Sequence, residues 1–105
     1  MPWQPFEEAK TIGAQGSEEG VIVRDEAHES GARITLETGC RKIPFAITCG
    51  IPSLMVHTVY ASSRERADSL MASMRVDLED ILALVSSQDQ PGYEAAISEF
   101  VRRYE

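Results

Sequence analysis

The stretch of sequence that decides the fold is VIVRDEAHESGARITLET, residues 21–38. Its two halves, Val21–Glu29 and Ala32–Thr38, alternate apolar and polar side chains with the period of two that a β-strand shows. Ser30–Gly31 between them suits a two-residue hairpin turn, because glycine adopts a positive φ without strain. The stretch therefore predicts an antiparallel β-hairpin, although Asp25 interrupts the apolar face of its first strand.

The position of the turn fixes which residues of the hairpin lie opposite each other. With the turn at Ser30–Gly31, Ala27 lies opposite Ile34 and Arg24 lies opposite Glu37. The apolar faces of the two strands then coincide, and the charged pair is complementary. We expect the hairpin to adopt this register.

Two further strands follow, at Phe45–Cys49 and Leu54–Tyr60, with Pro52 favouring a turn between them. If the loop at 39–44 sets Thr38 beside Phe45, Glu37 neighbours Ala46. If Cys49 lies opposite the leucine that begins the second strand, their apolar side chains also share one face. The four strands together predict an antiparallel meander.

After residue 61 the period of the apolar residues changes from two to three and four, which indicates helices. Ser62 with Glu65 three residues later is a capping box, and the helix that follows ends near 86–88. Pro91 suits the first turn of a second helix. The two apolar stripes are Ala67, Leu70, Met71, Met74, Leu78, Ile81, Leu82 and Val85, and then Tyr93, Ala96, Ile97, Phe100, Val101 and Tyr104.

Strands followed by helices are typical of the α+β class. We predict one domain over residues 1–105, with an N-terminal arm or loop at 1–20, a four-stranded antiparallel β-meander at 21–60 and a helical pair at 62–104. Both helices should pack on one face of the sheet. The opposite face should stay open.

The charge of the chain narrows the classes of partner. Seventeen acidic and ten basic residues give a net charge of −7, which repels phosphate backbones and anionic lipid, so we expect neither nucleic acid nor membrane as a partner. The chain shows no apolar stretch of the roughly 20 residues that span a bilayer and no signal-peptide pattern at residues 1–10. Two cysteines suit a reducing compartment, so we expect a cytoplasmic protein.

The sequence motifs that identify common sites are missing. The chain has no phosphate-binding loop, no dinucleotide glycine pattern and no nucleophile elbow. Its cysteines are nine residues apart and its histidines lack the spacing of zinc ligands. We therefore predict no metal, no cofactor and no catalytic residue from motifs alone.

The predicted registers gather polar residues on the open face of the sheet. Arg24, Glu37 and His57 fall in one row, and Thr35 and Thr48 fall in the next. A carboxylate beside an imidazole raises the imidazole pKa and fixes its tautomer, and an arginine binds anions. These five residues form the candidate ligand-binding site, although an ordinary solvated sheet face with cross-strand pairs is the favoured explanation.

The open face also carries apolar residues at one end. Ile22, Met55 and Val59 lie there in the predicted registers, and the meander has two exposed edges that must be covered, charged or paired. A symmetric homodimer would bury these three residues. Alternatively, the N-terminal arm covers them through Trp3 and Phe6.

One cysteine is a second candidate for chemistry. Cys40 stands beside Arg41 and Lys42, whose positive charges would lower the pKa of its thiol and favour a reactive thiolate. The alternative is an unreactive loop residue, because no base or oxyanion hole is identified for it. Cys49 is expected to point into the core.

Three functional hypotheses remain open at this point. The first is a small acidic, non-catalytic protein-interaction module that forms a homodimer or docks on a larger basic partner. The second is a protein that binds a small ligand or an anion on the open sheet face. The third is a small hydrolase or isomerase in which His57 is the base and Glu37 orients it.

Overall fold

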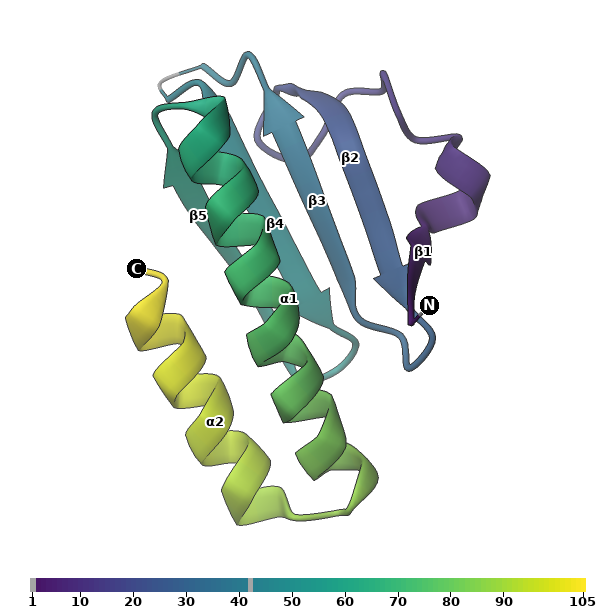
Figure 1. Ribbon diagram of the computed structural model, residues 1–105, viewed down its shortest axis with the longest axis vertical. Coiled ribbons are helices and arrows are strands. Elements are labelled where there is room, and N and C mark those ends of the chain that lie inside the picture. Colours follow the sequence, from purple (N-terminus) through teal and green to yellow (C-terminus); the bar gives the residue numbers. More distant parts are fainter. Residues whose placement is uncertain (1, 42) are drawn as a thin grey trace.

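The computed structural model describes residues 2–41 and 43–105 and has an antiparallel sheet followed by two C-terminal helices (Figure 1). The predicted α+β class is confirmed, but the sheet has five strands rather than four, in the order β1-β2-β3-β4-β5. The elements are β1 (Trp3–Pro5), β2 (Val21–His28), β3 (Arg33–Thr38), β4 (Phe45–Ile51), β5 (Met55–Ala61), α1 (Arg64–Ser86) and α2 (Gln90–Arg103).

The additional strand comes from the N-terminal arm. β1 pairs antiparallel with the end of β2, with Trp3 opposite His28, and therefore forms an edge of the sheet. A short 3-10 turn, Phe6–Ala9, then reverses the chain with positive φ angles at Glu7, Glu8 and Ala9. This reversal places the rest of the arm beside the start of β2, where Gln15 bridges to Val21.

The β2–β3 hairpin forms, but its predicted register is wrong by one residue. The turn contains three residues rather than two: the Gly31 amide donates to the His28 carbonyl at 2.8 Å, and the His28 amide donates to the Ala32 carbonyl at 2.7 Å. Gly31 has the positive φ, 105°, that this turn needs. Arg24 consequently pairs with Leu36, and not with Glu37.

A one-residue shift has a large effect, because side chains alternate between the two faces of a strand. Arg24 and Glu26 now project to the helix side of the sheet, and Asp25 projects to the open side beside Thr35. A β-bulge between Ile22 and Arg24 then shifts the register again and brings Ile22 opposite Glu37.

The other two pairings give one correct and one incorrect register. The β3–β4 register is confirmed, with Thr38 opposite Phe45. The β4–β5 register is wrong by three residues, because Cys49 lies opposite His57 rather than Leu54. Strand β4 continues to Ile51, and the turn begins only after it. The side chains of β5 that were expected on the helix side therefore lie on the open side, and the reverse.

The exchange in β5 has a direct consequence for burial. Leu54 and Val56, expected under the helices, are exposed, and Val56 is 79% accessible. Met55 and Val59, expected on the open face, belong to the core.

Local sequence signals set the ends of the helices. The side chain of Ser63, and not the predicted Ser62–Glu65 box, caps α1 by accepting a hydrogen bond from the Arg66 amide at 3.1 Å. The side chain of Asp89 caps α2 by accepting from the Gly92 amide at 3.0 Å.

The core lies between the sheet and α1. Figure 1 shows α1 lying across β3, β4 and β5, with α2 beside it, and α1 contacts all three of these strands. The predicted apolar stripe of α1 is buried except at Val85, which is partly buried. The fully buried large side chains of this layer are Ile34, Leu36, Ile47, Met71, Met74, Leu78, Ile81 and Cys49.

Candidate functional site

The structure separates the five residues of the predicted site. Arg24 and His57 lie on the helix side of the sheet, whereas Thr35, Glu37 and Thr48 lie on the open side. The predicted row of an arginine, a carboxylate and an imidazole is therefore wrong. Its cause is the pair of odd-numbered register shifts in β2 and β5, each of which exchanges the two faces of a strand.

His57 joins β5 to the end of α2. Its Nε2 atom lies 2.6 Å from the backbone carbonyl oxygen of Tyr104, and its ring meets the Phe100 ring edge to face with centroids 6.2 Å apart. Glu37, the residue expected to orient it, is on the opposite face of the sheet. This geometry makes His57 a docking contact between two elements and removes the basis for a base oriented by Glu37.

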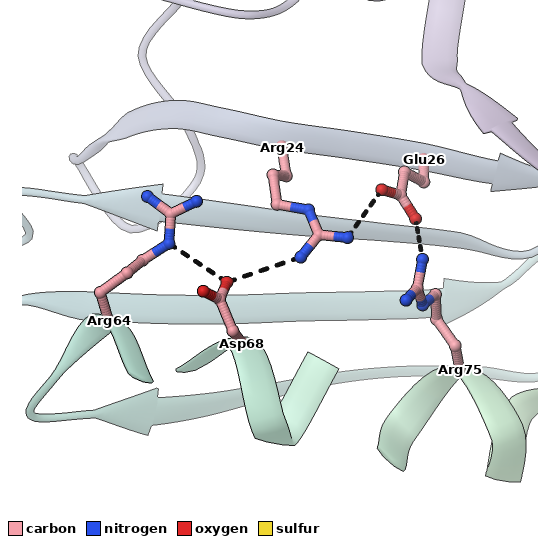
Figure 2. Close-up of polar contacts among 5 residues, drawn as sticks. All are labelled: Arg24, Glu26, Arg64, Asp68 and Arg75. Atoms are coloured by element: carbon pink, nitrogen blue, oxygen red, sulfur yellow. Dashed lines mark hydrogen bonds and ion pairs between the residues drawn. The ribbon is translucent and has the colours of Figure 1, made fainter. Parts of the chain in front are cut away.

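Arg24 belongs to a chain of ion pairs that connects β2 to α1 (Figure 2). Its guanidinium contacts Glu26 at 3.0 Å and Asp68 at 3.5 Å. Arg75 contacts the other oxygen of Glu26 at 2.6 Å, and Arg64 contacts Asp68 at 3.1 Å. Each of the five residues has at least one partner of opposite charge, so Arg24 is committed to structure.

The position of α1 explains why these helix-side residues of β2 are charged. The helix covers β3, β4 and β5, so side chains from β2 reach only its flank. Arg24 and Glu26 keep 29% and 20% of their side-chain surface accessible, which leaves the charges partly hydrated. Charged residues are tolerated on this face of β2, whereas the same face of β3, which α1 covers, requires apolar residues.

On the open face, Asp25 is the centre of a polar cluster that the predicted site did not include. Asp25 is 2% accessible, and its carboxylate accepts hydrogen bonds from Arg33, Thr35 and Thr11. Arg33 binds it with two nitrogens, Nε at 2.9 Å and Nη2 at 2.6 Å. The signal in the sequence was the acidic residue that interrupts the apolar alternation of the first strand.

The cluster shifts the protonation equilibria of its two charged members. Burial alone would raise the pKa of Asp25, but the hydrogen bonds from Arg33 and Thr11 outweigh it and hold the pKa below its usual value. The hydrogen bond to Asp25 likewise raises the pKa of Arg33. The Arg33 guanidinium also stacks on the Phe6 ring at 3.7 Å from its centroid, which attaches the arm to β3.

Glu37 is a second buried carboxylate and holds the arm segment, defined as residues 11–20. It is fully buried, and its Oε1 atom accepts hydrogen bonds from the backbone amides of Glu18 and Gly20, both at 3.1 Å. Gly16 lies so close that an added Cβ would collide with the Glu37 carboxyl group. Glu37 therefore anchors a loop, and glycine is required at position 16 for the loop to reach it.

Between the arm segment and the β4–β5 turn lies an open cavity of about 790 Å³. Its floor is the open face of the sheet, including Ala27, Thr35 and Thr48. The arm forms one side through Phe6 and 15–17, and residues 51–56 line the opposite side, including the side chains of Leu54 and Val56.

Few polar side chains on the floor of this cavity remain available. Asp25 and Glu37 are satisfied by the partners described above, and the Thr48 and Thr58 hydroxyls bond each other at 3.2 Å. Arg33 uses Nε and Nη2 on Asp25, and Nη1 has no hydrogen-bond partner among the described residues. Nη1 is thus the free donor on the floor, and Gln15, Ser17 and Ser53 add polar residues to the walls.

The three residues placed in a predicted dimer surface are buried within the chain. Ile22, Met55 and Val59 are 6%, 8% and 6% accessible. Met55 and Val59 pack in the core, and the arm pairs with Ile22 through Ala14 and Gly13, at 2.9 Å in both hydrogen bonds. Their predicted exposure on an open face is wrong, and the arm covers Ile22 instead.

Neither cysteine has the features of a reactive thiol. Burial, together with the nearby carboxylates Glu37 and Glu18, raises the pKa of Cys40, opposite to the predicted direction. Lys42, one of the cations in that prediction, lies outside the described residues. Burial raises the pKa of Cys49 to about 12.

Searches for other kinds of site and for known relatives gave no match. In residues 2–41 and 43–105, no group of His, Cys, Asp and Glu side chains has the arrangement of a metal site. No helix in the same part of the chain has the length and apolar character needed to cross a membrane. Models of protein families, curated proteins and solved structures were compared with the chain, and none matches it.

Proposed function

We propose that the chain is a non-catalytic binding protein whose cavity on the open sheet face takes a small, uncharged and mainly apolar molecule. The observation that carries this proposal is the cavity of about 790 Å³, which lies in the size range of ligand pockets, about 300–1,000 Å³. Small and apolar side chains dominate its lining, including Ala27, Ile22, Leu54 and Val56.

The charges around the cavity favour a neutral ligand over an anion. Arg33 is the one lysine or arginine among the described residues that line it, and Asp25 already neutralises that charge. Glu37, fully buried in the wall, adds a further negative charge. An anion would meet no excess positive charge, which makes the neutral class of ligand the better match.

The remaining polar groups define how such a molecule would be oriented. Nη1 of Arg33 is a donor on the floor of the cavity, so a carbonyl or ether oxygen that faces β3 would match it. Its apolar part would lie against Leu54 and Val56, which are otherwise exposed to water.

The proposal is tested with the neutral dye Nile red, whose fluorescence rises in an apolar site. We expect saturable binding to the intact protein, weakened at least about tenfold by Ala27→Phe, which fills the floor, and by Leu54→Glu, which charges the wall. Val76→Glu is the matched control, because Val76 is an exposed residue of α1 and should leave binding unchanged. Equal binding by all four proteins, or no saturable binding, would refute the proposal.

A protein-interaction module is the second candidate function. One observation favours it: the outer edge of β5 is long, uncharged and unpaired in the part of the chain that the structure describes.

A further inference from the structure

The two edges of the sheet differ in how well they are protected against pairing with another chain. β1 has three residues, ends at Pro5 and follows Pro2, and proline cannot donate a backbone hydrogen bond. β5 has seven residues, MVHTVYA, without proline, glycine or an acidic or basic side chain other than His57. Proline thus protects the β1 edge, whereas neither proline nor a row of charges protects the β5 edge.

The outer side of β5 has backbone groups to offer. β5 pairs with β4 on one side, and no other strand among the described residues pairs with it. In an antiparallel edge strand, alternate residues direct their N–H and C=O groups away from the sheet. The helix α2 contacts β5 from the helix side, through Tyr104 and His57, and Figure 1 shows α2 on the outer side of β5.

We propose that β5 pairs with β5 of a second copy of this chain, antiparallel and centred on Thr58, so that two sheets become one. In this register Val56 of each copy lies opposite Tyr60 of the other on the open face. Val56 is 79% accessible and Tyr60 is 48% accessible, and they are the two exposed large apolar side chains of β5. An aromatic residue opposite a β-branched residue is a favourable cross-strand pair.

The low charge of β5 makes this edge the least repulsive place for a second copy. The net charge of −7 would repel a copy at most surfaces; β5 itself has no acidic side chain, although the Tyr60 hydroxyl donates a hydrogen bond to Glu18 of the arm. At the centre of the register Thr58 faces Thr58, and such pairs can hydrogen-bond across strands. A strand pairing buries less than a standard interface, so we expect a dissociation constant of about 10–100 µM.

The dimer does not rest on the proposed ligand function, but it would extend the same site. Val56 lines the cavity, and the proposed register brings Tyr60 of the second copy against it. Ligand binding by the unaltered protein at about 1 µM, below the expected dissociation constant of the dimer, would therefore separate the failure of one proposal from the failure of the other.

Sedimentation velocity over a concentration range of about 1–500 µM tests the dimer and its register together. The double variant Val56→Lys with Tyr60→Lys creates two Lys–Lys pairs across the interface. We expect its dissociation constant to rise at least about tenfold. Val56→Lys with Tyr60→Glu creates two opposite-charge pairs instead and should keep the dimer. Val76→Lys, at an exposed site of α1, controls for added charge, and circular dichroism verifies that each variant is folded.

A cross-link provides a second readout that does not depend on charge. In a Cys40→Ser background, Thr58→Cys should form a disulfide-linked dimer under mild oxidation, because the register places position 58 opposite itself. Tyr60→Cys should cross-link much more slowly, since its counterpart lies four residues along the partner strand. A monomer throughout the concentration range, or equal behaviour of the two charge variants or of the two cysteine variants, would overturn the proposal.

Discussion

The two faces of the sheet are buried by different physical means. On the helix side, α1 covers β3 to β5 with apolar side chains, and Met71, Met74 and Leu78 are fully buried. On the open side, no helix packs on the sheet in the described residues, and the arm segment is held by two buried carboxylates, Asp25 and Glu37. Apolar packing holds one layer, and hydrogen bonds to charged groups hold the other.

The difference has a functional consequence. A helix packed on a sheet leaves no space between them, whereas a loop anchored at a few points leaves the cavity between the arm and the β4–β5 turn. The helix side should respond mainly to changes in side-chain volume. The open side should respond to changes in charge and pH.

The largest effect is expected on the helix side. Leu78→Ala removes a fully buried side chain from the layer between α1 and the sheet and should lower the free energy of unfolding by about 3–4 kcal/mol. Val76→Ala, an exposed site on the same helix, should change it by less than about 0.5 kcal/mol. Urea denaturation measures both, and similar values for the two variants would contradict the assignment of the core.

On the open side, Glu37→Gln keeps the size of the side chain but removes its charge. The amide loses the charge that strengthens the bonds from Glu18 and Gly20 and puts an NH2 donor where Oε2 accepts from the Glu18 amide, so we expect a loss of about 2–3 kcal/mol. Glu29→Gln, at an exposed residue, is the control and should be nearly neutral. If both variants unfold at the same urea concentration, Glu37 does not anchor the arm.

Asp25 should make the open side sensitive to acid. Its pKa in the folded chain lies below its usual value of about 3.9, so the unfolded chain binds more protons as the pH falls through this range. The stability that Asp25 contributes is thus fully present above about pH 5 and is lost toward its folded pKa. We expect Asp25→Asn to cost about 2 kcal/mol at pH 7 and to reduce the acid dependence of unfolding between about pH 5 and pH 2. An unchanged pH profile would contradict this role.

The smallest effect is expected in the ion-pair chain between β2 and α1. Glu26→Gln weakens its contacts with Arg24 and Arg75, whose charges stay partly hydrated, and should cost about 1 kcal/mol. A double-mutant cycle with Arg75→Gln should give a coupling energy below about 1 kcal/mol that decreases in 1 M salt. A coupling that salt does not change would show that these charges are more deeply buried than the structure indicates.

The sequence predicted the elements of the fold better than it predicted their pairing. The period of apolar residues identified the four strands β2 to β5 and the buried stripe of α1, because both depend on nearby residues. The fifth strand was missed, since a three-residue segment with two prolines around it has almost no strand signal. The turn after His28 has three residues where two seemed sufficient, and nothing local distinguishes these lengths strongly.

The errors in register explain why most of the predicted site was not found. A shift of one residue at β2 and of three at β5 moved Arg24 and His57 to the helix side. Thr35, Glu37 and Thr48 stayed on the open face because the β3–β4 register was correct. The contacts of Glu37 with the arm join residues about twenty positions apart, and no local pattern announces them.

Amide hydrogen exchange measured by NMR tests most directly the claim that buried carboxylates hold the arm on the open face. The account predicts that the amides of Glu18 and Gly20 are protected in the intact protein and lose that protection in Glu37→Gln, while the amides of α1 keep theirs. If both amides exchange in the intact protein at the rate of an unstructured peptide, the arm is not anchored and the cavity has no wall on that side.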